Sequence, residues 1–95
     1  MPSFDLKIDK QFLEDIALLK AENPKLAAKV WDLIEDILNG STNPLYGRGK
    51  PEALRGNLAG YYSRQINEKH RLIYRFDNLT SVLYLVSCFG HYDDK

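Results

Sequence analysis

The sequence predicts an α+β fold in a single domain over residues 1–95, with a helical hairpin packed on a small, mainly antiparallel sheet. Three observations predict it. A chain of 95 residues can enclose only one hydrophobic core. Two stretches with apolar residues at helical spacing follow each other early in the chain. Three β-rich stretches separated by short polar turns then occupy the second half, which favours an antiparallel meander.

The first half is expected to hold one strand and two helices. Residues 4–8 alternate apolar and polar side chains, which is typical of a short strand. Helical spacing then extends from Phe12 to about Glu22. Asn23 and Pro24 restart a helix as its cap and its first residue. The second apolar stripe ends at residues 39–40, an Asn-Gly pair typical of a helix terminus.

The second half is expected to hold a long loop and then the sheet. Residues 41–57 are rich in Gly, Pro, Ser and Asn, which predicts a loop. A loop of this length in so small a domain is usually functional or disordered. Strands are expected at 60–66, 70–76 and 81–88, with a last short strand near His91. In the middle strand, alternation places Leu72, Tyr74 and Phe76 on one face and Arg71, Ile73 and Arg75 on the other.

Charge is unevenly distributed along a chain of zero net charge. Residues 1–40 carry five basic and eight acidic side chains, a net charge of −3, and residues 41–95 carry +3. Residues 47–75 contain seven basic and only two acidic side chains, a net charge of +5. A basic zone of this kind can bind phosphate groups, and the alternative is an ordinary solvated charged face.

Several classes of protein are not expected from the composition. No apolar run reaches the roughly 20 residues of a membrane helix, and the N-terminus has no apolar signal region. We therefore expect a cytoplasmic protein with no membrane partner. The single Cys88 fits a reducing compartment. No Cys/His spacing resembles a zinc site, so neither a metal nor a cofactor is expected.

The stretch 49–74, GKPEALRGNLAGYYSRQINEKHRLIY, is followed near the chain end by Gly90-His91-Tyr92. This pattern resembles the Txe/YoeB family of the RelE/ParE superfamily of toxins. The resemblance implies a RelE-like βααβββ fold and a type II toxin–antitoxin module. It further implies a ribosome-dependent, metal-independent mRNA endoribonuclease that inhibits translation. The implied partners are a YefM/Phd-type antitoxin, mRNA in the ribosomal A site, and operator DNA only through the antitoxin complex.

The resemblance also assigns roles to particular residues. Glu52 is expected to be the general base, Arg71 to stabilise the phosphate, and His91 to be the general acid with Tyr92 beside it. Four further residues are expected to contact RNA: Lys50, Arg55, Arg64 and Tyr62. Gln65 departs from the family pattern, because relatives often carry a second basic residue there. The acidic pair Asp93-Asp94 after the His-Tyr is a second departure.

These residue types suit metal-free RNA cleavage. A base removes the proton of the 2′-hydroxyl, an acid protonates the departing 5′-oxygen, and an arginine stabilises the phosphorane. The expected product carries a 2′,3′-cyclic phosphate or the phosphate derived from it. Two alternatives remain open at this point. One is a ParE-like gyrase poison, which does not need this set of residues. The other is a catalytically inactive module that only binds its antitoxin and operator DNA.

Overall fold

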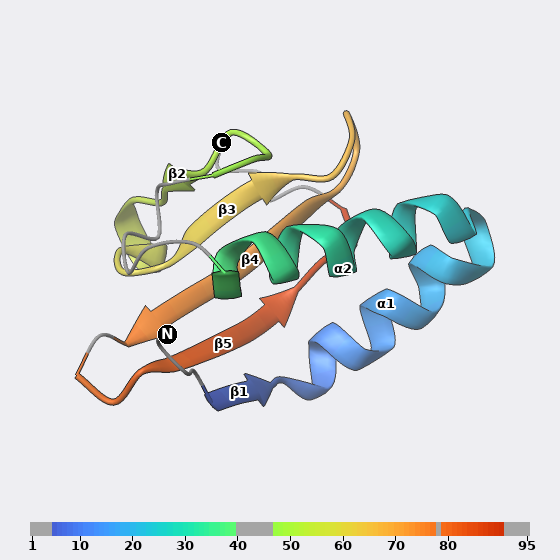
Figure 1. Cartoon of the computed structure of the whole chain (residues 1–95). Helices are drawn as coiled ribbons and strands as arrows, with labels where there is room; N and C mark the ends of the chain where they lie inside the picture. Colours follow the sequence, from blue (N-terminus) through green and yellow to red (C-terminus); the bar gives the residue numbers. More distant parts are fainter. Residues whose placement is uncertain (1–4, 40–46, 78, 91–95) are drawn as a thin grey trace.

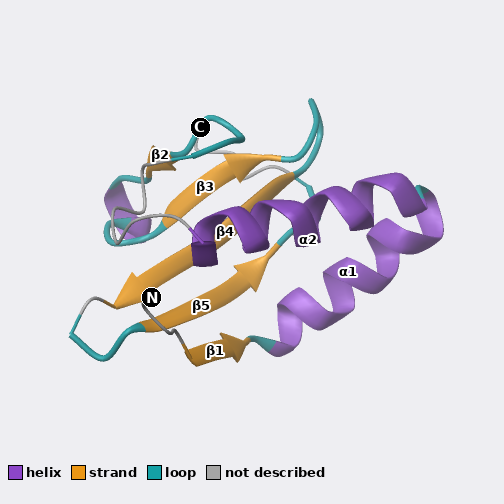
Figure 2. Ribbon diagram, viewed as in Figure 1, coloured by secondary structure: helices purple, strands orange, loops and turns teal. Residues whose placement is uncertain are grey.

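Two helices lie on one face of a five-stranded mixed sheet in the computed structural model, which describes residues 5–39, 47–77 and 79–90 (Figures 1 and 2). The sheet order is β1-β5-β4-β3-β2. The α+β class and the helical hairpin are therefore confirmed. The elements in chain order are β1 (Asp5–Ile8), α1 (Lys10–Glu22), α2 (Pro24–Asn39), β2 (Glu52–Ala53), the 3₁₀ turn η1 (Gly56–Leu58), β3 (Tyr62–Gln65), β4 (Arg71–Asp77) and β5 (Val82–Ser87).

The sheet is antiparallel except at one edge, where β1 pairs parallel with β5. This arrangement puts β5 between β1 and β4, which explains why its sequence is apolar on both faces. The pairing of β4 with β5 shifts register between Ile73 and Tyr74. The strands predicted for the second half are confirmed, each one to three residues shorter or shifted at its ends.

The predicted long loop is partly wrong. Within 41–57 the chain forms β2, which pairs with β3 so that Glu52 lies opposite Ser63. The Leu54 amide then donates a hydrogen bond to the Tyr61 carbonyl, at 2.9 Å, and η1 closes the connection. A strand of two residues has no alternating pattern to detect, so only tertiary pairing reveals it. The expected helix end at Gly40 and the short strand near His91 lie outside the described residues.

The break between the helices follows the predicted chemistry. The Asn23 side chain accepts a hydrogen bond from the Lys25 amide at 3.0 Å, and Pro24 occupies the first helical position. The Asn23 amide donates to the Leu19 carbonyl at 2.8 Å, which ends α1. One residue therefore terminates the first helix and starts the second.

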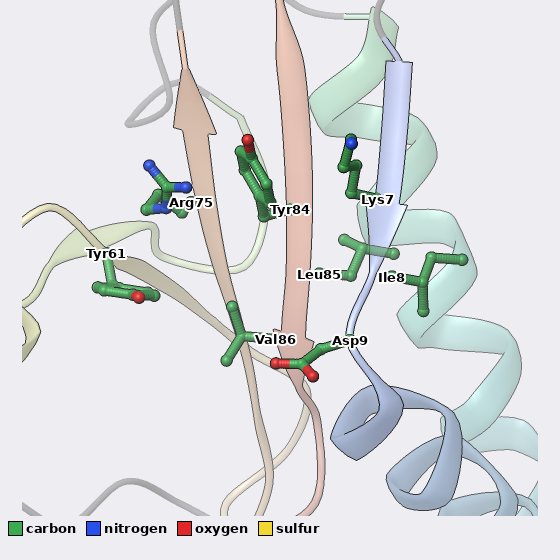
Figure 3. A pocket seen from close by; sticks show the side chains of 8 residues that line it. All are labelled: Lys7, Ile8, Asp9, Tyr61, Arg75, Tyr84, Leu85 and Val86. Carbon is green, nitrogen blue, oxygen red and sulfur yellow. The ribbon is translucent and has the colours of Figure 1, made fainter.

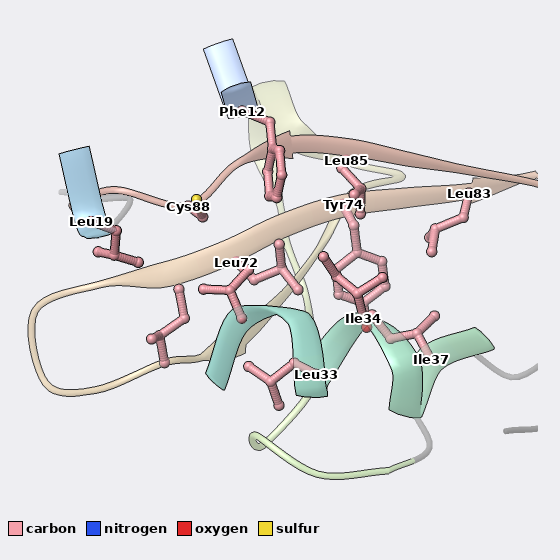
Figure 4. Packing of buried hydrophobic residues seen from close by; sticks show 12 residues of the cluster. Phe12, Leu19, Leu33, Ile34, Ile37, Leu72, Tyr74, Leu83, Leu85 and Cys88 are labelled. Carbon is pink, nitrogen blue, oxygen red and sulfur yellow. The ribbon is translucent and has the colours of Figure 1, made fainter. Parts of the chain in front are cut away.

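The core fills the space between the two helices and the central strands (Figure 4). Its buried members come from α1, α2, β4 and β5 and include Phe12, Leu19, Leu33, Ile34, Ile37, Leu72, Tyr74, Leu83 and Leu85. Cys88 is fully buried at the end of this layer, and burial raises the pKa of its thiol to about 12. The thiol stays protonated at neutral pH, so Cys88 is a packing residue and not a nucleophile.

A buried arginine links α2, β3 and β4 beneath the core. The side chain of Arg64 is completely buried, and its Nη1 donates to Asp36 Oδ2 at 2.9 Å. Its Nε donates to the Tyr74 hydroxyl at 2.9 Å, and Nη1 also reaches the Arg48 carbonyl at 3.1 Å. The Arg48 amide donates back to Asp36 Oδ2 at 3.0 Å. We call these four residues (Asp36, Arg48, Arg64 and Tyr74) the Arg64 network.

We expect Asp36→Asn to lower the free energy of unfolding at pH 7 by about 3 kcal/mol, because it leaves a buried guanidinium without its counter-charge. The Arg48 amide and then Arg64 hold the pKa of Asp36 below its ordinary value of 3.8, against the opposing effect of burial. The stabilisation is therefore complete above pH 3.8 and is lost as pH falls through the lower folded pKa.

Urea unfolding from pH 7 down to pH 2 checks this expectation. The difference between wild type and Asp36→Asn should narrow only below pH 3.8. Asp32→Asn, at an exposed position of the same helix, is the matched control and should change stability little. Equal effects of the two substitutions would show that the Arg64 network does not stabilise the fold.

Candidate functional site

The face of the sheet turned away from the helices carries the candidate site; we call it the open face. Alternation along β4 places Leu72 and Tyr74 in the core and Arg71, Ile73 and Arg75 on the open face, as the sequence predicts. The register extends this face to the neighbouring strands. Ser63 lies opposite both Glu52 and Ile73, and Gln65 lies opposite Arg71.

Glu52 and Arg71 come together on this face although 19 positions separate them in the sequence. Arg71 Nη1 lies 3.8 Å from Glu52 Oε1. The carboxylate side chain is 64% exposed and the guanidinium side chain 33% exposed, so both are accessible to a substrate. A carboxylate beside an arginine on an open surface can accept a proton next to a bound phosphate group.

The segment before Glu52 is held in place by close backbone packing. The Gln65 amide donates a hydrogen bond to the Gly49 carbonyl at 2.6 Å. Gly49 has φ +86°, and a Cβ there would lie 3.0 Å from a Leu33 methyl and 3.1 Å from Arg64 Cβ. Any side chain at Gly49 would push this segment away from α2 and β3. The glycine therefore fixes where β2, and with it Glu52, meets the sheet.

The C-terminal end of the described chain is also tied to β4. The Arg71 amide donates to the Gly90 carbonyl at 3.1 Å, and the Gly90 amide donates to His70 Nδ1 at 2.7 Å. His70 is buried, with its ring centroid 4.6 Å from that of Phe89. Because a backbone amide can only donate, His70 Nδ1 is the acceptor of this hydrogen bond. His70 Nε2 lies 3.4 Å from Glu22 Oε1 and makes no hydrogen bond with any described residue.

The structure contradicts one of the predicted RNA contacts and turns a second toward the helices. Arg64 is fully buried in the Arg64 network, so its guanidinium has no surface to offer to a phosphate. Tyr62 lies opposite Tyr74, with the ring centroids 5.8 Å apart, and packs against the core on the helix side of the sheet. Side chains alternate along β3, so Tyr62 and Arg64 point to one face and Ser63 points to the other. Ser63 lies opposite Glu52 on the open face, which places Tyr62 and Arg64 on the helix side.

The remaining predicted site residues divide into two groups. Lys50 and Arg55 are exposed on either side of β2, where an RNA contact is sterically open. Lys50 adopts φ +50°, a left-handed conformation at the entry to the strand. His91 and Tyr92 lie outside the described residues. Among residues 5–39, 47–77 and 79–90, His, Cys, Asp and Glu side chains form no group of three that could hold a metal ion.

Sequence comparison identifies the class to which this fold and face belong. The family model for the YoeB-like toxin of bacterial type II toxin–antitoxin systems matches residues 8–92. The toxin YoeB of Mycobacterium bovis is 40% identical over 70 residues, which cover 74% of this chain and 79% of that protein. The chain therefore belongs to the YoeB family of type II toxins.

Solved structures agree with the family. The YoeB/ParE toxin from Agrobacterium tumefaciens superposes with a TM-score of 0.83 at 31% identity, covering 94% of this chain and all of the other. The heterotetrameric YoeB-YefM complex from Staphylococcus aureus gives 0.77 at 37% identity, covering 96% of this chain and all of that one. No helix among the described residues is both long and apolar enough to cross a membrane.

We expect His70→Leu to release the segment around Gly90, because it removes the acceptor of a partly buried amide at a cost of about 1–3 kcal/mol. His70→Asn is the matched variant, since its side-chain oxygen can replace Nδ1 as the acceptor. Amide hydrogen exchange followed by NMR should be faster at Gly90 in His70→Leu than in His70→Asn. Unchanged exchange at Gly90 in both variants would refute the role of this hydrogen bond.

Proposed function

We propose that this toxin is a ribosome-dependent, metal-independent endoribonuclease that cleaves mRNA in the ribosomal A site and thereby inhibits translation. The observation that carries the proposal is the accessible Glu52–Arg71 pair on the open face. The family adds support, because Glu52 and Arg71 both lie within the sequence pattern, residues 49–74, that resembles the Txe/YoeB toxins. Cleavage would take place in the cytoplasm, where mRNA is translated.

Each residue of the proposed site has one chemical role. Glu52 removes the proton of the 2′-hydroxyl, which then attacks the adjacent phosphorus. Arg71 stabilises the charge that develops on the phosphorane oxygens. His91 protonates the departing 5′-oxygen. Tyr92 follows His91 directly in the sequence and contacts a neighbouring base. The hydrogen bonds of Gly90 to His70 and Arg71 support this assignment, because they tether the residue before His91 to the strand that carries Arg71.

The position of Arg71 explains how a chain with Gln65 can keep this chemistry. Gln65 lies directly opposite Arg71 on the open face, at a position where the resemblance to the family implies a basic residue. The uncharged Gln65 supplies no cation to the surface around the phosphate. Arg71 retains the role at the phosphorus, with Lys50 and Arg55 as exposed cations near β2. We expect weak binding of free RNA, since few phosphates are neutralised.

The proposed partner is an antitoxin of the YefM/Phd type. The S. aureus relative is in a complex with YefM, and it is 37% identical to this chain. A small toxin with a basic zone suits an acidic, partly disordered segment that folds on binding. Operator DNA would be contacted only through the toxin–antitoxin complex.

We expect Glu52→Gln and His91→Ala to slow cleavage by about 100-fold or more, because each removes a proton-transfer group. Arg71→Gln should have a similar effect by removing the phosphorane contact. Primer extension on a translated mRNA, with and without ribosomes, measures the cuts. Glu68→Gln, at an exposed position in the turn between β3 and β4, is the control and should cleave as the wild type does.

The outcome separates the proposed function from its alternatives. Cuts that require ribosomes and disappear in Glu52→Gln and His91→Ala support the nuclease. Wild-type rates in both variants would refute the proposed mechanism. Absence of cuts by the wild type in both conditions would refute the nuclease itself, and DNA gyrase inhibition would then test the ParE-like alternative.

A further inference from the structure

A hollow lies on the open face, with neither Glu52 nor Arg71 in its lining (Figure 3). Its volume is about 240 Å³, and its lining comes from β1, β4, β5, the residue between β1 and α1, and the residue before β3. Two cations and two aromatic side chains dominate it: Lys7, Arg75, Tyr61 and Tyr84. We call it the β-face hollow. None of these four residues belongs to the site implied by the family pattern.

Cationic and aromatic side chains alternate across the strands in this hollow. Lys7 lies opposite Tyr84 in the parallel pair, and Tyr84 lies opposite Arg75 in the antiparallel pair. Tyr61 immediately precedes β3, and extending the antiparallel register one residue beyond Tyr62 and Tyr74 places it opposite Arg75. Figure 3 shows Arg75 between the two tyrosines, with Lys7 beyond Tyr84. The sheet register therefore forms one row in the order Tyr61, Arg75, Tyr84, Lys7.

The charges in the row are available to a ligand. The Arg75 guanidinium carbon lies 4.1 Å from the centroid of the Tyr84 ring, a stacked cation–π contact that fixes both groups. Among the described residues, the side chains of Lys7 and Arg75 make no hydrogen bond and no ion pair within 4.0 Å, although the Arg75 charge also acts on the Asp77 carboxylate. Asp9 lines the far end next to Val86, so the anion-binding part is the end that carries Lys7 and Arg75.

The hollow continues the face that carries the proposed nuclease site. Arg71 and Arg75 lie on the same side of β4, four residues apart. At about 3.3 Å per residue, their Cα atoms are roughly 13 Å apart along the strand. A single strand of RNA with its reacting phosphate at Arg71 can therefore extend along β4 and reach Arg75.

We propose that the β-face hollow binds a nucleotide of the RNA that flanks the cleaved phosphodiester, an inference that rests on the proposed nuclease function. Lys7 and Arg75 contact a backbone phosphate of that nucleotide. Its base stacks on the exposed side of the Arg75–Tyr84 pair or on Tyr61, as bases do on aromatic and guanidinium planes in single-strand binding sites. Because stacking tolerates every base, this subsite adds affinity and reach without reading the sequence.

An acidic peptide is the competing occupant, and two features favour RNA. Planar rings alternate with cations at the spacing of neighbouring strands, which suits a ligand that alternates bases with phosphates. An acidic segment long enough to cover the hollow would also meet the Asp9 carboxylate. A flanking nucleotide can occupy the cationic end alone.

The test uses fluorescein-labelled single-stranded RNA in which 2′-O-methyl groups prevent cleavage, in a long form and in a form shortened on each side of the scissile position. Binding of the intact toxin is measured by anisotropy at several salt concentrations. Arg75→Gln and Tyr84→Leu should each weaken binding of the long RNA at least fivefold. Arg75→Gln should also reduce the salt slope by about 0.7, the loss of one single-strand phosphate contact.

The shortened RNA separates this subsite from the site at Glu52. The affinity of wild type should fall when the flanking nucleotides are removed. The affinities of Arg75→Gln and Tyr84→Leu should be nearly the same for the shortened RNA as for the long RNA. Lys29→Gln, an exposed cation on α2 away from the open face, is the matched control. Cleavage of ribosome-bound mRNA should show a raised KM with an unchanged kcat in Arg75→Gln.

Each contrary result has a separate meaning. If wild type cleaves mRNA but Arg75→Gln and Tyr84→Leu bind the long RNA as Lys29→Gln does, the subsite is refuted while the nuclease stands. If both variants lose binding to a YefM-type antitoxin and not to RNA, the hollow is a protein-binding surface and the proposal is wrong. If Arg75→Gln raises KM on ribosome-bound mRNA but binds the free long RNA as wild type does, the contacted phosphate is ribosomal and the flanking-nucleotide proposal is refuted. Failure of wild type to cleave any RNA refutes the proposed function itself.

Discussion

The ion pair between the buried Arg64 and Asp36 joins α2 to β3 and to the segment that leads to Glu52. A buried guanidinium must be neutralised and hydrogen-bonded, and here one carboxylate on α2, one carbonyl and one phenol meet that requirement. Burial raises the pKa of the Tyr74 phenol, so the hydroxyl remains protonated while it accepts a hydrogen bond from Arg64. The same carboxylate binds the Arg48 amide, which orients the segment leading to β2. Helix, sheet and the strand that carries Glu52 are thus positioned by one charge pair.

Two arginines of similar sequence context have opposite roles because a β-strand alternates its faces. Arg64 and Arg71 both lie on strands of the sheet, and both are bound to a carboxylate. Arg64 points toward the helices and is completely buried from solvent. Arg71 points to the open face and remains accessible. A carboxylate partner therefore says little about function until the face of the sheet is known. On the open face the pair is available for chemistry, and on the other it stabilises the fold.

The local patterns predicted most of the architecture and only part of the site. Apolar spacing and the Asn23-Pro24 break located both helices, and alternation assigned Arg71 and Arg75 to one face of β4. With the Glu52–Ser63 pairing known, alternation along β3 would also have assigned Tyr62 and Arg64 to the helix side of the sheet. That pairing, the Asp36–Arg64 bridge and the hydrogen bond between Gly90 and His70 join residues distant in sequence. No periodicity encodes such contacts, because they arise only when the sheet and helices pack.

The position of β5 gives the chain a particular order of assembly. Both β1 and α1 pack on this last strand, and the Cys88 amide is bound by the Asp15 carboxylate across 73 positions of sequence. Contacts this distant in sequence make folding slow, since a large loop must close before they form. A nascent chain that lacks β5 has no strand on which β1 and α1 can dock. This domain therefore reaches its folded form only after β5 has left the ribosome that made it.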